Sequence, residues 1–482
     1  MRQKLAKGLF WKLLENGGAQ GVQFVITMIL ARLLTPAEYG VVGIIMVFIT
    51  IANVFVQNGF STALVQKRRA DPEDFSSVCW FELAAALVMY GILYGLSGGI
   101  AAFYKIQVLK PIVRVLGLVL FPGAVISVQT AYVSRNMEFK GLFVSTLAAS
   151  LVSGAVSIAM AFAGLGVWAM AGQQMTYYLA LMTALFVTVS WKPRRCFCLG
   201  RIKEMFSFGW KVLCASLLDT VFNNLYGLFI GKIYNEELLG SYNRGEQFPK
   251  LIAGNLGAAI QAVLLPAFSA RQDDPVQMCQ MARRVMKLSA FAVLPMLFGL
   301  FGVADTLILV LLGPKWLICV PFLRIMCVAY CFWPIHIINL QAVNAMGRSD
   351  VFLKLEIAKK VLSLLALLIG VRYSVYVMVG LKAVQDFLCT FVNGAPNRRL
   401  LGYSIWQQWR DILPSAFLAA FMCLIVMAAG QVLAWMAPGI RLVIQIGAGA
   451  GLYVVLAWGF RMESFRYLWS MARERRKRAQ GE

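Results

Sequence analysis

The 482-residue sequence has few charged residues, few acids and a single histidine. Only 14% of its residues are charged, compared with about 25% in an ordinary soluble domain. With His336 as the only histidine and ten scattered cysteines, it lacks the ligand spacing of zinc or haem sites and the pattern of a disulfide framework. We therefore expect no metal and no cofactor, and no segment is polar enough to form a separate soluble domain.

The motifs of common enzyme classes are also missing. There is no glycine-rich phosphate loop followed by lysine, no paired-histidine metal motif and no nucleophile elbow. A net charge of +23 would suggest nucleic-acid binding in a soluble protein, but no basic patch is interleaved with stacking aromatic residues. We expect neither an enzyme nor a nucleic-acid-binding protein.

Long apolar segments are abundant instead. Hydrophobic residues make up 60% of the chain and the mean hydropathy is +0.72. Runs of about 20 apolar residues recur throughout, and each can cross the ~30 Å hydrocarbon core of a bilayer as a helix. The sequence predicts an all-α polytopic membrane protein with about fourteen transmembrane helices, at residues 13–33, 40–64, 78–103, 111–134, 142–163, 166–190, 209–231, 239–268, 284–312, 316–343, 351–371, 374–394, 412–435 and 440–460.

The distribution of basic residues predicts the orientation of these spans. Most of the 45 Lys and Arg residues fall at the two ends of the chain and in alternate loops. Because basic loops stay in the cytoplasm, we expect both termini there. The tail at 463–482 contains the run RERRKR and is expected to lie against anionic membrane lipids.

The chain repeats itself at about two hundred residues. GLFWKLL at 8–14 matches FGWKVL at 208–213, and ARLLTPAEYG at 31–40 matches GKIYNEELLG at 231–240. Six spans separate the copies, so both have the same orientation, as in transporters built from two parallel halves. We predict a six-helix half at 1–195, a second at 196–397, helices thirteen and fourteen at 398–462, and the basic tail at 463–482.

The first helix of each predicted half carries a stripe of polar side chains. The stripes are Asn16, Gln20, Gln23 and Thr27 in the first half, and Ser216, Asp219, Asn223 and Tyr226 in the second. One interpretation is hydrogen bonding between helices. The other is a shared hydrophilic cavity, in which Asp219 would bind a coupling proton or cation.

Charged residues also lie within spans eleven and twelve. They are Glu356, Lys359, Lys360, Lys382 and Asp386. Helical spacing would let Glu356 pair with Lys360 and Asp386 with Lys382, which would only lock the helices together. Alternatively, three cations against two acids leave one lysine for an anionic partner, since an unpaired charge at this depth is costly. Arg324 in span ten would add to the same positive field.

Three segments resemble those of a known family. LARLLTPAEYGVVGIIMVFITIANVFVQNGFSTALVQKR at 30–68 resembles the first hairpin of the bacterial oligosaccharide flippases, the polysaccharide transporter family. GRSDVFLKLEIAKKVLSLL at 347–365 and NRRLLGYSIWQQWRDILPS at 397–415 resemble the starts of its spans eleven and thirteen. This family belongs to the superfamily of multidrug, oligosaccharidyl-lipid and polysaccharide exporters.

The resemblance implies a transporter that flips undecaprenyl-diphosphate-linked oligosaccharide from the cytoplasmic to the periplasmic leaflet by alternating access. The products would be exopolysaccharide, capsule or O-antigen, and a glycan polymerase and glycosyltransferases would be partners. Candidate substrate-binding residues are Lys359, Lys360, Lys382 and Arg324 for the diphosphate, and Gln20, Gln23, Asn223 and Tyr226 for the glycan. Candidate ion-coupling residues are Asp219, Glu356 and Asp386.

Two alternatives remain at this point. One is a cation-coupled multidrug exporter of the same superfamily, which would usually have twelve spans and fewer buried cations. The other is a membrane glycan polymerase or ligase, which would carry a large periplasmic loop. The longest outer segment that we expect, near 232–240, is much shorter than that.

Overall fold

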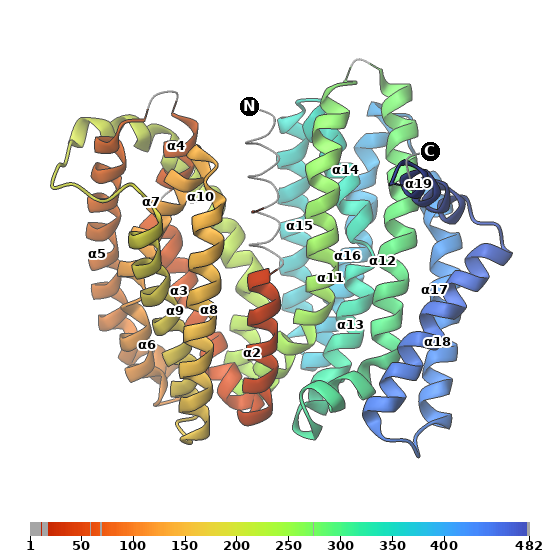
Figure 1. Cartoon of the computed structure of the whole chain (residues 1–482), viewed down its shortest axis with the longest axis horizontal. Coiled ribbons are helices and arrows are strands. Elements are labelled where there is room, and N and C mark those ends of the chain that lie inside the picture. Colours follow the sequence, from red (N-terminus) through yellow and green to blue (C-terminus); the bar gives the residue numbers. More distant parts are fainter. Residues whose placement is uncertain (1–10, 12–17, 58, 68–69, 273, 480–482) are drawn as a thin grey trace. The chain divides into compact units, whose positions relative to one another are not determined.

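The computed structural model describes residue 11 and residues 18–57, 59–67, 70–272 and 274–479 (Figure 1). All regular secondary structure within these ranges is helical. Eleven of the helices are long and apolar enough to cross a membrane, judged by length and composition. The all-α, multi-pass membrane fold expected from the sequence is therefore confirmed.

The chain divides into two compact units, Met1–Gly240 and Ser241–Glu482, each treated separately here. The first unit contains the helices from α2 to α10. Their bounds are α2 (Gln20–Leu33), α3 (Pro36–Gln57), α4 (Phe60–Gln66), α5 (Pro72–Tyr104), α6 (Leu109–Gly117), α7 (Leu120–Asn136), α8 (Phe139–Phe162), α9 (Val167–Thr188) and α10 (Leu199–Ile233).

The helix α11 (Glu236–Ser269) begins at the end of the first unit and continues into the second. The other helices of the second unit are α12 (Pro275–Leu311), η2 (Pro314–Cys319), α13 (Val320–Tyr330), α14 (Trp333–Ala345), α15 (Ser349–Gly370), α16 (Val375–Leu400), α17 (Ile405–Val432), α18 (Pro438–Gly459) and α19 (Glu463–Ala479).

Each of the predicted spans overlaps at least one of these helices. Spans two, four and ten are interrupted: α3 and α4 share the second, α6 and α7 the fourth, and η2, α13 and α14 the tenth. The helices α2, α9 and α15 are not among the eleven that meet the length and composition of a membrane span. The number fourteen therefore stays a prediction.

The division into units differs from the boundaries that we drew from the repeat. α10, which we expected to open the second half, packs against α3, α4 and α5 in the first unit. The compact unit accordingly ends at Gly240 rather than near residue 195. Compactness and internal repetition are different properties, so the half boundaries at 195 and 397 stay predictions.

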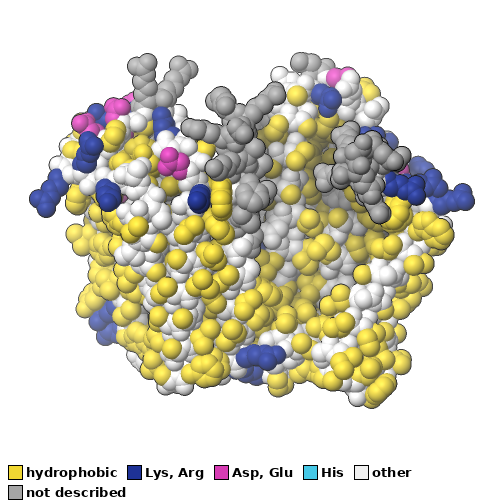
Figure 2. Space-filling view, viewed as in Figure 1, with side chains coloured by type: hydrophobic (Ala, Val, Ile, Leu, Met, Phe, Trp, Pro, Cys, Tyr) yellow, Lys and Arg dark blue, Asp and Glu magenta, His cyan; other side chains and the backbone are white. Residues whose placement is uncertain are grey.

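Apolar side chains fill the interior of each unit and also cover its flanks. In the first unit, Phe60, Phe75 and Leu185 belong to a fully buried cluster between α4, α5 and α9. Figure 2 shows hydrophobic side chains over the sides of the helices, while charged side chains gather near the end of the bundle that carries α4. Val187 and Phe162 are 86% and 73% exposed. Such an apolar outer surface suits contact with lipid.

The α2–α3 and α10–α11 corners are built alike. Thr35 Oγ1 accepts a hydrogen bond from the Glu38 backbone N–H, and Asn235 Oδ1 accepts one from the Leu238 backbone N–H at 2.8 Å. These are N-terminal caps, which satisfy backbone donors at the start of a helix. The two caps stand two hundred residues apart, the offset of the sequence repeat.

Two glycines let these corners touch through their backbones. A Cβ atom on Gly40 would lie 1.7 Å from the carbonyl oxygen of Glu236, and one on Gly240 would lie 1.9 Å from that of Pro36. No side chain fits at either position. The contact is reciprocal, because residues 36 and 236 correspond under the same offset that relates Gly40 to Gly240.

Candidate functional site

A buried ion pair in the second unit joins α16 to α11. Lys382 Nζ lies 2.7 Å from Glu246 Oε1 and 3.1 Å from the hydroxyl of Tyr242. The Tyr330 hydroxyl of α13 also donates to Glu246 Oε1, at 3.4 Å. The two charged side chains are only 21% and 18% exposed. Three helices therefore meet at one ion pair, in which the acid compensates the charge of the lysine.

A cavity of about 340 Å³ lies along α14, α15 and α16. Its polar lining comes from Gln261 of α11 and from His336, Gln341, Asn344, Lys359, Gln385 and Asp386. Lys359 also forms an ion pair with Glu356, one turn earlier on α15. The structure thus brings two of the predicted residues, Lys359 and Asp386, into one cavity. One cation, one acid and several amides can together bind an anionic group that also carries hydroxyls.

Hydrogen bonds between side chains hold the walls of this cavity. Asn393 Nδ2 lies 2.9 Å from His336 Nδ1, which links α16 to α14. A buried amide network extends the link to α17: Asn339 Nδ2 donates to Gln408 Oε1 at 2.7 Å, and Asn397 Nδ2 donates to Asn339 Oδ1 at 2.6 Å. Buried networks of this kind fix the positions of neighbouring helices.

A second polar cavity, of about 300 Å³, lies in the first unit. Gln20 and Gln23 of α2 line it, facing polar side chains of α8 and α9, which are Thr146, Ser150, Gln173, Gln174 and Tyr177. Amides and hydroxyls both donate and accept hydrogen bonds, so this surface suits a ligand rich in hydroxyl groups. Asn16, which we grouped with these glutamines, lies outside the described residues.

Five other predicted residues line neither of these cavities. On α10, Asp219 and Asn223 are exposed, whereas the Tyr226 side chain is buried. Lys360 is half-buried on α15. Arg324 of α13 forms an ion pair with Asp305 of α12, and its guanidinium also approaches the ring of Phe301. Their assignment to substrate or ion binding stays a prediction.

We did not predict Glu246, the acid that pairs with Lys382. Helical spacing had suggested Asp386, which instead lines the neighbouring cavity. Glu246 lies in α11, within the span that we expected at 239–268. A signal was available, because Tyr242 and Glu246 stand four residues apart and so share one face of the helix.

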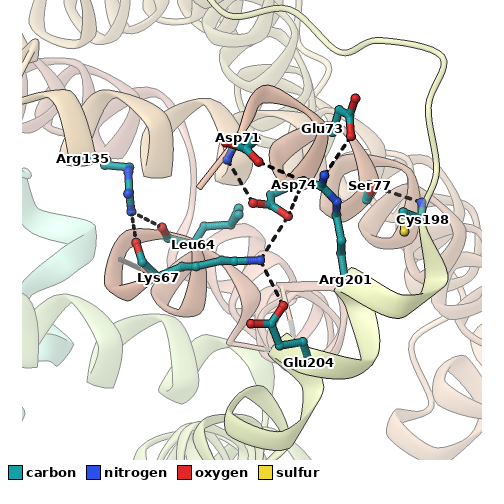
Figure 3. A network of polar contacts seen from close by, with 10 residues as sticks. All are labelled: Leu64, Lys67, Asp71, Glu73, Asp74, Ser77, Arg135, Cys198, Arg201 and Glu204. Carbon is teal, nitrogen blue, oxygen red and sulfur yellow. Dashed lines mark hydrogen bonds and ion pairs between the residues drawn. The ribbon is translucent and has the colours of Figure 1, made fainter. Parts of the chain in front are cut away.

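A third polar cluster ties the α4–α5 loop to the start of α10 (Figure 3). Lys67 Nζ lies 3.2 Å from Asp74 Oδ1 and 3.1 Å from Glu204 Oε2. Arg201 reaches Asp74 and Glu73, at 2.9 Å each. Burial lowers the pKa of Lys67, but hydrogen bonds to Glu204 and Asp74 outweigh that effect and leave this pKa raised. The structure therefore places the α4–α5 loop beside the start of α10.

An apolar cavity of about 450 Å³ lies between α12, α17 and α18 in the second unit. Met296, Leu300, Val303, Val426 and Tyr453 are among its lining residues. The buried Gln445 adds one polar side chain, whose Nε2 donates to the carbonyl oxygen of Val426 at 3.0 Å. Such a surface fits a hydrocarbon chain rather than a polar ligand.

Residues 29–321 match the model of a family described as "Polysaccharide biosynthesis protein". The chain belongs to this family. The match covers more than half of the sequence, including all of the first unit from α3 onward. It confirms the resemblance to polysaccharide transporters drawn from the first hairpin.

Several curated proteins of polysaccharide synthesis are similar to this chain over two thirds of its length or more. The teichuronic acid biosynthesis protein TuaB of Bacillus subtilis is 24% identical over 94% of this chain and 95% of its own length. The lipopolysaccharide biosynthesis protein WzxC of Escherichia coli is 23% identical over 86% and 87%. The succinoglycan biosynthesis transport protein ExoT of Rhizobium meliloti is 23% identical over 67% of this chain, and the match spans 65% of that relative.

The fold of the present chain is also found in solved structures of transporters. The lipid II flippase MurJ, in an inward closed conformation, superposes with a TM-score of 0.72 at 13% identity, covering 94% of this chain and 99% of MurJ. An inward-facing multidrug resistance transporter of the MATE family gives a TM-score of 0.61 at 15% identity, covering 80% and 94%. At these identities the likeness shows a shared fold alone.

Proposed function

We propose that this protein flips a lipid-linked oligosaccharide across the bacterial inner membrane during polysaccharide biosynthesis. Its relatives are named for succinoglycan transport and for teichuronic acid and lipopolysaccharide synthesis, and MurJ is named as a flippase. The substrate would be an undecaprenyl-diphosphate-linked oligosaccharide that moves from the cytoplasmic to the periplasmic leaflet. The observation that carries this proposal is a pair of partly buried lysines: Lys359, which lines a polar cavity, and Lys382, on the next helix.

The diphosphate is the part of such a substrate that needs cations. Lys359 lines the cavity with Asp386, while Lys382 is held by Glu246. Phosphate oxygens can replace a carboxylate as the partner of a lysine, with hydrogen bonds of similar strength. In our proposal the diphosphate exchanges with Glu356 and Glu246, so each lysine has a negative partner at every stage. Lys360 and Arg324 would extend the positive field.

The glycan and the lipid need different surfaces. The glutamine-lined cavity of α2, α8 and α9 offers amides to sugar hydroxyls. Asn223 and Tyr226 of α10 would add contacts of the same kind. The apolar cavity of α12, α17 and α18 would hold part of the polyprenyl chain. This support comes from the chemistry of each cavity taken separately.

Energy would come from an ion gradient rather than from a nucleotide. Asp219, Glu356 and Asp386 are our candidates for coupling, because they are carboxyl groups within or beside spans. Both termini would be cytoplasmic, with the basic tail against anionic lipids. Glycosyltransferases would supply the substrate and a glycan polymerase would consume the product.

Neither alternative function has an observation in its favour. The likeness to a multidrug transporter is a likeness of fold, and the curated relatives are named for polysaccharides. A polymerase or ligase would need a large outer catalytic segment. The α10–α11 connection, which we took as the longest outer segment, spans only two residues between Ile233 and Glu236.

The proposal predicts that Lys359→Ala combined with Lys382→Ala abolishes surface polysaccharide. Both cations that we assign to the diphosphate would be gone, so the substrate would lose its charge-assisted hydrogen bonds. Surface polysaccharide would be measured in a deletion strain complemented with each variant, with membrane levels followed by immunoblot. Lys354→Ala, which removes an exposed lysine of α15, is the matched control. Normal polysaccharide from the double variant, at normal membrane levels, would refute the diphosphate role.

A further inference from the structure

Glu82 is a carboxyl group enclosed in the first unit, and no function described above uses it. It lies on α5, about 15 Å from the start of the helix at 1.5 Å per residue. Its side chain is 0% exposed. The apolar residues Val78, Phe81 and Leu83 of the same helix belong to or pack against the buried cluster of this unit. Neither carboxyl oxygen makes a hydrogen bond of ordinary geometry within the described part of the chain.

Two hydroxyl groups connect this carboxyl to a less enclosed region. The Ser127 hydroxyl of α7 faces Glu82. Ser127 Oγ is in turn hydrogen-bonded to Ser61 Oγ of α4. Both serines are partly exposed, unlike Glu82. The three side chains form a row across α4, α7 and α5 that runs from accessible hydroxyls to a buried acid.

The carboxyl has no cationic partner in the described residues. The helices packed against α5 are α3, α4, α6, α7 and α10, and none of their described Lys or Arg side chains interacts with it. Among the titratable side chains of the described residues, Cys79, a turn earlier on α5, is the one that interacts electrostatically with Glu82. Glu82 thus differs from Glu246 and Asp411, which are paired with Lys382 and Arg283.

The enclosure decides what Glu82 can bind. An ionised carboxylate without a partner is strongly disfavoured in an apolar interior, so the neutral acid is the stable form. A metal cation would need several more oxygen ligands, whereas a proton needs only the carboxyl itself. We propose that Glu82 is a proton-binding site, filled and emptied through Ser127 and Ser61.

The proton transfer along this row is balanced at each step. Ser61 Oγ accepts a proton from a hydronium ion, which becomes water, and passes its own to Ser127 Oγ, which passes its own to an oxygen of the Glu82 carboxylate. One proton moves, no electron is transferred, and release runs in the opposite direction. If the bound proton supplies energy for transport, that role deepens the proposed function and rests on it. Proton binding by Glu82 does not depend on the proposed function.

Infrared difference spectroscopy on the full-length protein in lipid vesicles tests the site without any substrate. At pH 7 the wild-type protein should show the C=O stretching band of a protonated carboxyl group. This band should be absent in Glu82→Gln. In Ser127→Ala the band should remain, but its hydrogen–deuterium exchange should slow, on the order of a hundredfold, because the relay is cut. Glu237→Gln, at an exposed acid of α11, is the control and should change neither.

A Glu82→Gln spectrum identical to wild type would overturn the proton site. Because glutamine has the shape of the protonated acid, a folding defect in this variant would also count against it. For the coupling role, surface polysaccharide should fall in Glu82→Gln and be partly retained in Glu82→Asp, which can still titrate. Normal polysaccharide from Glu82→Gln would overturn that role. The spectroscopic result stands whether or not the substrate is a lipid-linked glycan, so the two failures are distinguishable.

Discussion

Lys382 is a residue whose neighbours define what it can do. Its ammonium contacts Glu246 and the hydroxyl of Tyr242, and because both charged side chains are mostly buried, water screens the ion pair only weakly. Removing one partner of such a pair leaves the other charge buried without compensation, which costs more than the pair itself contributes. The acid is therefore as important to the lysine as any ligand would be.

We predict that Glu246→Gln destabilises the protein by about 3 kcal/mol. The amide cannot neutralise Lys382, so a buried cation remains unpaired. Thermal unfolding in detergent would measure the loss, and Lys382→Met in the same chain should restore most of it. Asp305→Asn, which breaks the half-exposed pair with Arg324, should cost less than about 1 kcal/mol. Equal losses in the two single variants would contradict this view of the Lys382 pair.

At this scale the sequence predicted the cations and not their partners. Lys359 and Lys382 stood out because lysine is rare inside an apolar span, and both are partly buried beside acids. Helical periodicity relates a residue only to others three or four positions away. Glu246 is 136 residues from Lys382, so only the tertiary fold of the second unit brings the two side chains together. Glu82 was overlooked for a similar reason, since burial is not visible in the sequence.

At the scale of elements, helices break where backbones must approach closely. The second predicted span consists of two helices: α3 ends at Gln57 and α4 begins at Phe60. Between them lies Gly59, which has a positive φ of 71°. A Cβ at Gly59 would lie 2.8 Å from Val212 Cβ of α10. Hydropathy predicts the whole span because both pieces are apolar. It does not predict the break, which depends on a neighbouring helix far along the chain.

The crossing of α3 and α11 leads to a prediction about Gly40. We expect Gly40→Ala to lower the unfolding free energy by about 3 kcal/mol, since the new methyl meets a backbone carbonyl that cannot rotate away. Gly240→Ala should cost a similar amount, because its contact with Pro36 is equivalent. The measurement is thermal unfolding of each purified variant.

Gly95→Ala provides the matched control for this crossing. Gly95 also lies within a helix, but a Cβ there would have no heavy atom within 4 Å. Its substitution should be neutral or stabilising by up to about 1 kcal/mol, as usual for glycine in a helix. If Gly40→Ala behaved like Gly95→Ala, the close backbone crossing would be wrong.

At the scale of the whole molecule, composition and the residues of the loops were enough to predict the fold class. A chain that is 60% hydrophobic must satisfy its backbone hydrogen bonds within each membrane span, and helices do so. The family was visible in the first hairpin, whose residues fall within the matched range 29–321. The compact division at Gly240 could not be predicted, because it depends on α10 packing against α3 and α5.

The charge distribution predicts that both termini are cytoplasmic. Green fluorescent protein fused after Glu482 should then fluoresce, and alkaline phosphatase fused at the same place should be inactive, because its disulfides form only in the oxidising periplasm. A fusion after Asn235, in the α10–α11 corner, should give the opposite pair of results. Active phosphatase after Glu482 would reverse the orientation and place the basic tail outside.

The reciprocal glycine contact has a consequence for the origin of the chain. In a symmetric dimer, a patch on one subunit touches the same patch on the other, so residue i meets j′ and residue j meets i′. Gly40 with Glu236, and Gly240 with Pro36, follow that rule under a shift of two hundred residues. This is the pattern expected if an ancestral chain of half this length paired with a second copy through one corner. Fusion of two gene copies would then have turned a contact between subunits into a contact within one chain. Each corner would since have evolved under the constraint of fitting the other.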